Sequence, residues 1–268
     1  MIVDVSEPLI VTDARPVFEF QTTGTDAWPT WDRFISLRGG LKFQIGNICN
    51  TCDFFFQRLS DALPDTRPSR DIATTLNAGV ANLRSIPVGE ILPMLPDGAY
   101  RVALSRGVPR LVRPGAPGDY FADEQVELWK ADPTMLRDDL HDPGTPYYRF
   151  GMRNLGEGRA LYEVVIPTIP VEELDANTVQ RYLDRLNKTG TALAVSVLDV
   201  KGSARFGDTP QLDITEHWML AHYLLDGNHK TYAASQGERE ITVLSFVTLE
   251  HGISTAQEVA EALTTVPR

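Results

Sequence analysis

The stretch YLLDGNHKTYAA, residues 223–234, decides how the C-terminal half of the chain folds. Its apolar start, which ends at Leu225, predicts a strand. A sharp turn follows, because Gly227 adopts a positive φ without steric cost. Asn228 favours the start of a helix, and the two alanines at the end are small enough to let that helix lie close on a sheet. The stretch therefore predicts a strand, a turn and a helix in direct succession.

Regular elements are predicted on both sides of this turn. Apolar runs and helical periodicity indicate strands at 160–166, 192–200, 217–225 and 241–249, and helices at 170–188, 228–236 and 254–263. Segment 217–225 also fits a short helix that passes into a strand. If it is a strand throughout, His217 and His222 lie on opposite faces, because their separation is odd. The mixture of elements predicts an α+β fold.

The first 155 residues are less regular. Their patterns indicate a strand at 41–45, helices at 53–63, 69–83, 123–130 and 133–140, and a hairpin formed by 100–104 and 110–113. Turn-forming residues at 142–144 and 156–158 indicate a linker. We therefore expect an N-terminal α+β region of unknown fold, residues 1–155, and a C-terminal domain, residues 156–268.

Composition limits the class of partner. The formal net charge of -11 opposes contact with nucleic acid and with anionic lipid, while the apolar content of 43% suffices for a core. No stretch approaches the roughly 20 apolar residues of a membrane span. The N-terminus lacks the basic start of a signal peptide, and two cysteines do not make an extracellular disulfide framework. We expect a cytoplasmic protein that binds small molecules, and a homodimer stays an open alternative.

The turn at residues 226–230 carries chemistry as well as structure. A helix N-terminus has free backbone amides and a positive dipole end, and here it is flanked by a glycine and by His229 and Lys230. These features favour a phosphate or another anion. The alternative is a structural strand-to-helix turn, in which His229 forms a hydrogen bond inside the fold.

The same residues resemble the ParB/sulfiredoxin superfamily. The shared pattern is an apolar strand, an Asp-Gly-x-His-Lys/Arg turn, a helix with paired alanines and a strand rich in Val and Ile. Residues 169–174 are similar to the opening segment of the superfamily and residues 240–246 to its closing strand, so the resemblance covers roughly residues 160–250. It is closest to the free-serine-kinase-like members and to the bacterial branch with two consecutive histidines. It implies a mixed sheet with helices, and a nucleotide-phosphate site at the turn.

Two residues depart from that pattern. Asn228 stands where one branch has a histidine, and Lys230 stands where arginine is usual. A point charge then replaces the bidentate fork that arginine offers to phosphate. The turn also lacks the cysteine of sulfiredoxins, so the resemblance does not imply reduction of a sulfinic acid.

The resemblance to free-serine kinases implies a nucleotide-dependent phosphotransferase that acts on a small molecule, with ATP or ADP and Mg²⁺ as cofactors. The residues expected to bind the nucleotide phosphates are Gly227, Asn228, His229 and Lys230. The expected catalytic residues are Asp226 on the metal or phosphate side, His229, and Glu172 as the base toward the acceptor hydroxyl. Glu172 and Glu173 also fit a plainer role as partners of a helix dipole. The alternative function is a non-catalytic nucleotide-binding switch or interaction protein.

Cys49 and Cys52 form the other unusual segment, followed at once by Asp53 and three phenylalanines. One interpretation is a redox pair, with a thiol pKa lowered at a helix N-terminus. A second is half of a Zn²⁺ site. Its remaining ligands would come from His141, His217, His222, His229 and His251. A third is a pair of reduced, half-buried thiols beside an aromatic cluster. A metal or thiol protein is therefore a further functional hypothesis.

Overall fold

A computed structural model of the chain describes residues 1–24, 26–27, 30–37, 40–59, 69–86, 88–129, 143–185, 190–203 and 213–264. The strands of its larger sheet are β1 (Ile2–Val5), β2 (Leu9–Val11), β7 (Gly98–Gly107), β8 (Arg110–Val112), β9 (Tyr147–Gly156), β10 (Arg159–Ile166), β11 (Thr191–Gly202), β12 (Glu216–Asp226) and β13 (Ile241–Thr248). The smaller sheet holds β3 (Phe18–Thr23), β4 (Asp32–Leu37), β5 (Gly40–Asn47) and β6 (Gln57–Arg58). The α-helices are α1 (Arg70–Ala78), α2 (Val88–Ile91), α3 (Val126–Trp129), α4 (Ala176–Leu183), α5 (Asn228–Gln236) and α6 (Ala256–Ala262). No helix in this part of the chain is long and apolar enough to cross a membrane.

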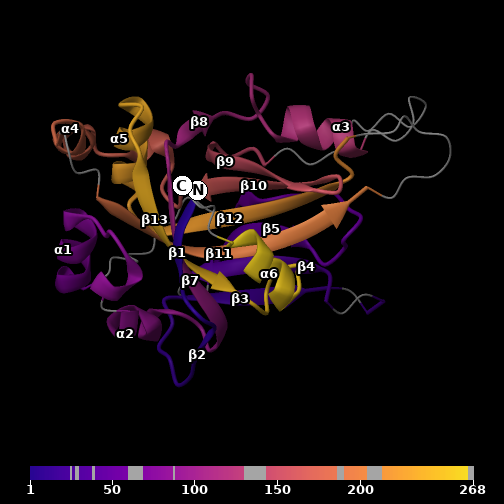
Figure 1. The fold of residues 1–268 in the computed structure, drawn as a ribbon, viewed down its shortest axis with the longest axis horizontal. Coiled ribbons are helices and arrows are strands. Elements are labelled where there is room, and N and C mark those ends of the chain that lie inside the picture. The colour runs from indigo at the N-terminus through magenta and orange to yellow at the C-terminus, as the bar shows by residue number, and fades with distance from the viewer. Residues whose placement is uncertain are drawn as a thin grey trace.

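The larger sheet is mixed. Its order is β1-β7-β13-β11-β12-β10-β9-β8, with β2 also paired to β7 (Figure 1). Strands β10 and β12 run parallel, as do β11 and β13, whereas β11 and β12 run antiparallel. Helix α4 joins β10 to β11 across β12, and α5 joins β12 to β13 across β11. An α+β fold is therefore confirmed.

The larger sheet is strongly curled. The hydroxyl oxygen of Ser105 on β7 lies 3.0 Å from Oε1 of Glu163 on β10, although β13, β11 and β12 separate the two strands. In a flat sheet those four spacings would hold the strands roughly 19 Å apart. The sheet must therefore bend round until β7 and β10 face each other across its concave side.

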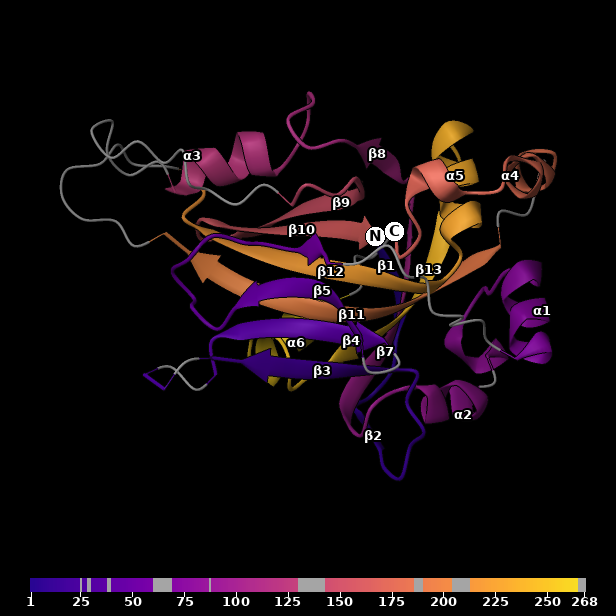
Figure 2. The same cartoon turned by 180° about the vertical axis from the view of Figure 1, so that it is seen from behind.

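Each face of the larger sheet has its own cover. The smaller sheet packs on one face and α6 on the other, as Figures 1 and 2 show from opposite sides. The ring of Phe43 on β5 meets that of Tyr223 on β12, with centroids 5.4 Å apart. On the concave face, Val259 of α6 packs in one apolar cluster and Ala234 of α5 in another. Strand β13 is consequently buried along its whole length.

The prediction for residues 223–234 is confirmed. Strand β12 ends at Asp226, Gly227 has φ +105°, and α5 begins at Asn228. A Cβ on Gly227 would lie 2.7 Å from Cβ of Ala192, so this position needs glycine for both space and conformation. The strand-turn-helix order follows from local sequence because each step depends on the residue at the turn itself.

Most other predicted elements of the C-terminal half are confirmed. The four predicted strands appear as β10, β11, β12 and β13, and Thr255 caps α6 through a capping box with Glu258. His217 and His222 do lie on opposite faces, since one contacts Tyr120 and the other Ser196. The helix expected at 170–188 is shorter, because Asp175 is extended and caps α4 instead. Residues 186–189 lie outside the described part.

Two predictions for the N-terminal half are wrong. Residues 53–56 are not helical and 57–58 form β6, because Phe54 and Phe56 both enter the core from an extended chain. Strands β7 and β8 form no hairpin with each other, since β7 pairs with β13 and β8 pairs with β9. The helix expected at 69–83 ends at Ala78, before Gly79 with φ +85°. The helix expected at 133–140 lies outside the described residues.

Both halves of the chain contribute to the larger sheet. Strands β1, β2, β7 and β8 come from the first 155 residues, β9 crosses residue 155, and β10 to β13 come from the remainder. The expected boundary at residue 155 falls inside β9, next to its last residue, and β9 pairs with β10.

Replacement of Gly227 by Ala tests the turn. The turn would force alanine into a positive φ, which costs about 1–2 kcal/mol, and its Cβ would be overpacked against Ala192, which costs about 1–3 kcal/mol. We expect the free energy of unfolding in chemical denaturation to fall by about 2–5 kcal/mol. Gly89→Ala in α2 is the matched control, because no atom lies within 4 Å of its Cβ position. Equal effects of the two substitutions would show that position 227 does not require glycine.

Candidate functional site

The ammonium group of Lys230 binds to other groups of the protein. Its Nζ donates to Oδ2 of Asp226 at 2.7 Å and to the carbonyl oxygen of Thr191 at 2.9 Å. The side chain is only 3% exposed. Lys230 therefore fastens the turn after β12 to the start of β11, and its ammonium group is neutralised by Asp226.

Asn228 and His229 fasten the same turn to the segment after β10. The side-chain amide of Asn228 accepts from the backbone N–H of Ile169 at 3.2 Å and donates to Thr168 Oγ1 at 3.0 Å. Nε2 of His229 accepts from the backbone N–H of Asp175 at 3.1 Å. Burial lowers the pKa of His229, although the nearby carboxylates of Asp175 and Asp226 act to raise it. The lowered pKa favours the neutral imidazole. These contacts are those of a structural turn, in which His229 accepts a hydrogen bond from the backbone of Asp175.

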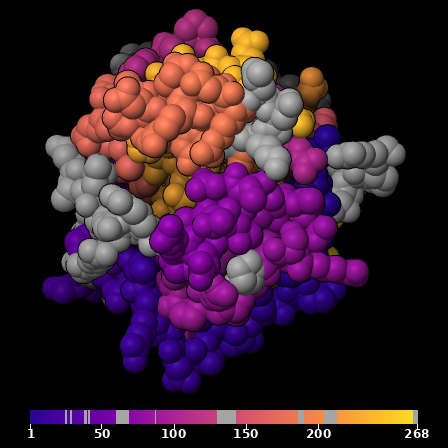
Figure 3. Space-filling view, turned by 90° about the vertical axis from the view of Figure 1, so that its left-hand side faces the viewer, coloured from indigo at the N-terminus to yellow at the C-terminus, as the bar shows by residue number. Residues whose placement is uncertain are grey.

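Helices gather over this end of the sheet. Figure 3 shows the salmon residues of α4 above the purple residues that include α1. The hydroxyl of Tyr182 in α4 donates to Oδ1 of Asn77 in α1 at 3.0 Å, and Thr191 Oγ1 accepts from the N–H of Val80 at 2.9 Å. The turn is thus part of a packed corner of the molecule.

Glu172 lies on the surface near that corner. Its carboxylate pairs with Arg113 at 2.9 Å, and both side chains are more than half exposed. Burial acts to raise the pKa of Glu172, but the hydrogen bond from Arg113 outweighs it and the pKa falls. The described residues show no hydrogen bond that joins Glu172 to Asp226 or His229. Among the residues expected to be catalytic or to bind phosphate, Asp226 and Lys230 contact each other through their side chains.

The two cysteines form a disulfide. Cys49 and Cys52 lie in the loop between β5 and β6, with Cα atoms 5.4 Å apart, and both are half-buried. The loop does not begin a helix, so the helix dipole expected to lower a thiol pKa is missing. Any electrostatic effect on the sulfurs must therefore come from charged side chains near the loop.

Contacts without sulfur hold nearly every residue of this loop, called here the cysteine loop (residues 48–54). Trp129 Nε1 donates to the carbonyl of Thr51 at 3.0 Å, and the N–H of Gly202 donates to the carbonyl of Asn50 at 3.1 Å. The remaining bonds join Ile48 to Trp31, Cys49 to Asn47, Asp53 to Lys201 and Phe54 to Gln125. The loop is consequently fixed to the end of β11 and to α3.

Two buried cations lie beside the cysteine loop. Lys201 Nζ donates to the carbonyl of Asp53, the residue after Cys52, at 2.9 Å. Burial lowers the pKa of Lys201 to about 8, a fall that Asp199 and Asp53 reduce, so its ammonium is charged at neutral pH. Arg33 donates to both carboxylate oxygens of Asp199, at 2.9 and 2.6 Å, and bridges the two sheets. The sequence offered one signal for Lys201, a charge directly after the apolar run 192–200.

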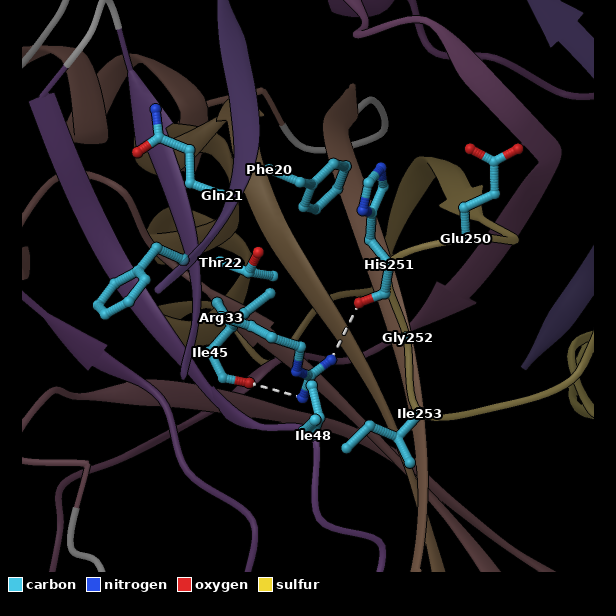
Figure 4. A pocket seen from close by; sticks show the side chains of 11 residues that line it. Phe20, Gln21, Thr22, Arg33, Ile45, Ile48, Glu250, His251, Gly252 and Ile253 are labelled. Atoms are coloured by element: carbon cyan, nitrogen blue, oxygen red, sulfur yellow. Dashed lines mark hydrogen bonds between the residues drawn. The ribbon is translucent and has the colours of Figure 1, made fainter. Parts of the chain in front are cut away.

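A half-open pocket of about 250 Å³ adjoins the loop at Ile48. Figure 4 shows the rings of Phe20 and His251 facing each other on its wall, with centroids 4.2 Å apart. Arg33 reaches the carbonyls of Ile45 and His251 at its base. Since Arg33 is fully engaged by carbonyls and Asp199, the pocket offers mainly apolar and aromatic surface.

A zinc site would need more ligands than the two sulfurs. Within the described residues there is no group of three or more His, Cys, Asp or Glu side chains that could hold a metal ion. His217 contacts Tyr120, His229 contacts Asp175 and His251 stacks on Phe20. His141 lies outside the described residues. Sulfurs that are bonded to each other do not ligate zinc as thiolates, and the zinc hypothesis stays a prediction.

The form of β12, its turn and α5 is what the ParB/sulfiredoxin resemblance implies. No family model, no curated protein and no solved structure matches this chain. The described residues establish an α+β fold with a large curled mixed sheet. Membership of that superfamily stays a prediction.

Proposed function

We propose that the protein is a thiol–disulfide redox protein, in which Cys49 and Cys52 cycle between dithiol and disulfide. The observation that carries the proposal is the disulfide in a loop held by other contacts. Such a loop keeps its shape when the S–S bond opens, so the two sulfurs stay close and oriented. Closure of the ring then costs little entropy, and oxidation and reduction both proceed in the folded protein.

The reaction balances with a disulfide or a pair of thiols as the second reactant. One cysteine thiolate attacks a substrate disulfide, forms a mixed disulfide and releases the first substrate thiolate. The other cysteine, as its thiolate, then attacks the mixed disulfide and releases the second one. The protein loses two electrons and two protons, and the substrate becomes two thiols. The reverse sequence reduces the protein.

The cations beside the loop favour this chemistry. A thiolate is stabilised by nearby positive charge, which lowers the thiol pKa and raises the reactive fraction at neutral pH. Lys201 would be the source of such a charge, since its ammonium is bonded to the backbone carbonyl of Asp53, the residue after Cys52. Partial exposure of both cysteines gives a reactant access to sulfur.

Reaction of the reduced protein with dithiobis(nitrobenzoate), an aromatic disulfide that releases a coloured thiolate, tests the proposal. We expect two thiolates released per chain and no reagent retained in the mass spectrum. The second release should be independent of reagent concentration, because the neighbouring cysteine displaces it within the molecule.

Cys49→Ser and Cys52→Ser are the matched controls for this reaction. Each should release one thiolate and keep one nitrobenzoate group, because no second thiol can displace it. A wild-type protein that keeps two nitrobenzoate groups would show that the cysteines act independently, and the proposal would fail. Stoichiometric zinc with unreactive thiols would favour the metal hypothesis instead.

We infer a second candidate function, the binding of a nucleotide phosphate by the backbone amides of the first turn of α5. The specific observation is that this helix begins after Gly227 in the left-handed conformation without a side-chain cap. Lys230 then contributes no direct contact, because Asp226 and Thr191 hold it. In this candidate the protein is a phosphotransferase dependent on ATP or ADP with Mg²⁺, or a nucleotide-binding switch.

Thermal denaturation with ATP or ADP, each with and without Mg²⁺, tests this second candidate. A ligand at about 100 times its Kd adds about 2.7 kcal/mol of stability. We therefore expect the melting temperature to rise by several degrees. Adenosine is the matched control and should give no rise, since it lacks phosphate. The absence of any rise with ATP and ADP, or an equal rise with adenosine, would contradict this function.

A further inference from the structure

A layer of polar side chains crosses the concave interior of the larger sheet. Its members come one each from neighbouring strands β7, β13, β11, β12 and β10, and they are Ser105, Ser245, Ser196, His222 and Glu163. All are buried, with exposed fractions of 6% or less. The apolar clusters under α5 and α6 flank this layer on either side. Five polar groups at one level of an otherwise apolar interior need a reason beyond packing.

Hydrogen bonds join most of the layer. The hydroxyls of Ser196 and Ser245 lie 2.7 and 2.9 Å from Nδ1 of His222, and Ser105 donates to Oε1 of Glu163 at 3.0 Å. Nε2 of His222 has no hydrogen-bond partner in the described residues and lies 3.7 Å from Oε1 of Glu163. The layer thus holds a buried carboxylate beside an imidazole nitrogen with no hydrogen bond of its own.

The carboxylate of Glu163 is ionised at neutral pH. Burial acts to raise its pKa, but His222, the amino group of Met1 and Ser105 outweigh burial and lower the pKa to about 2. A buried ionised carboxylate is costly unless it is paired and hydrogen-bonded. Its Oε2 lies 3.6 Å from the amino nitrogen of Met1, beyond hydrogen-bond distance. This oxygen therefore has room for a closer cationic partner.

A cavity of about 290 Å³ opens over this carboxylate. Its lining is mainly apolar and includes one carboxylate, that of Glu163. The lining residues are Met1, Ile2, Gly151, Met152, Arg153, Leu161 and Glu163. A Cβ on Gly151 would lie 2.9 Å from Oε2 of Glu163, so the glycine leaves the carboxylate accessible. The guanidinium of Arg153 donates to the carbonyls of Ala262 and Thr264 at the end of α6.

We propose that this cavity binds a small primary amine as its ammonium ion. The ammonium nitrogen donates a hydrogen bond to Oε2 of Glu163, and the alkyl body packs on Leu161 and Met152. Glu163 is the carboxylate of the lining, whereas the two cations there, Met1 and Arg153, are held by backbone carbonyls. A neutral ligand would forgo the charge-assisted hydrogen bond to Oε2. A charge-assisted hydrogen bond in a buried site is the strongest polar contact this cavity offers. The ammonium group of Met1 keeps its 2.7 Å hydrogen bond to the carbonyl of Arg106, so Oε2 is left to the ligand.

Methyl NMR of protein labelled at methionine tests the proposal, with n-butylammonium as the probe. The Met152 methyl lines the cavity, whereas Met219 lies on the opposite face of the sheet and serves as the internal control. We expect a saturable shift of the Met152 resonance and no shift of Met219. Neutral n-butanol at the same concentrations should leave Met152 unshifted. Equal binding of the alcohol would mean an apolar cavity only and would overturn the proposal.

Glu163→Gln tests whether the negative charge of Glu163 is needed to bind the ammonium ion. The amide retains an acceptor for Ser105 but removes the negative charge, so binding of n-butylammonium should weaken about tenfold or more. Glu157→Gln changes the same charge on the exposed turn between β9 and β10 and should bind as the wild type does. The Met152 and Met219 resonances report whether each variant is folded. Unchanged affinity in Glu163→Gln would overturn the proposal.

Discussion

Burial of β11, β12 and β13 on both faces is the constraint on which the rest of the structure depends. These strands lie in the middle of the curled sheet, with the smaller sheet on one side and α5 and α6 on the other. Their interior positions must be apolar or paired, so exposed chemistry is left to the ends of the strands. The two candidate sites lie accordingly at opposite ends of β11. Thr191 receives Lys230 at its start, and Gly202 holds the cysteine loop at its finish.

The two ends use their polar groups differently. At the start of β11, the motif that resembles a phosphate site commits Asn228, His229 and Lys230 to protein partners. At its finish, backbone and side-chain contacts fix the cysteine loop without help from sulfur. The side chains of the motif therefore bind within the protein, whereas the two sulfurs are bonded to each other and remain able to exchange. This difference is why the redox function has more support from geometry than the phosphotransferase that the resemblance implies.

Local patterns predicted what depends on neighbours in sequence. Strands β10 to β13, the turn at Gly227 and the cap of α6 follow from apolar runs and from turn and cap residues. Long-range partners were not predictable in this way. Strand β7 pairs with β13, far along the chain, so the expected hairpin failed. The same reason hid the bond of Lys230 to Thr191, the anchors of the cysteine loop, and the polar layer, whose members are single polar residues within apolar strands.

Equilibration of the protein in glutathione buffers, with the dithiol and disulfide forms separated by mass and the fold followed by circular dichroism, shows whether Cys49 and Cys52 are a reversible redox pair in the folded protein. We expect one reversible transition between the two forms with an unchanged fold, because the contacts that hold the cysteine loop do not involve sulfur. A disulfide that opens only when the protein unfolds would contradict it. So would a dithiol that stays reduced under oxidising conditions and carries zinc.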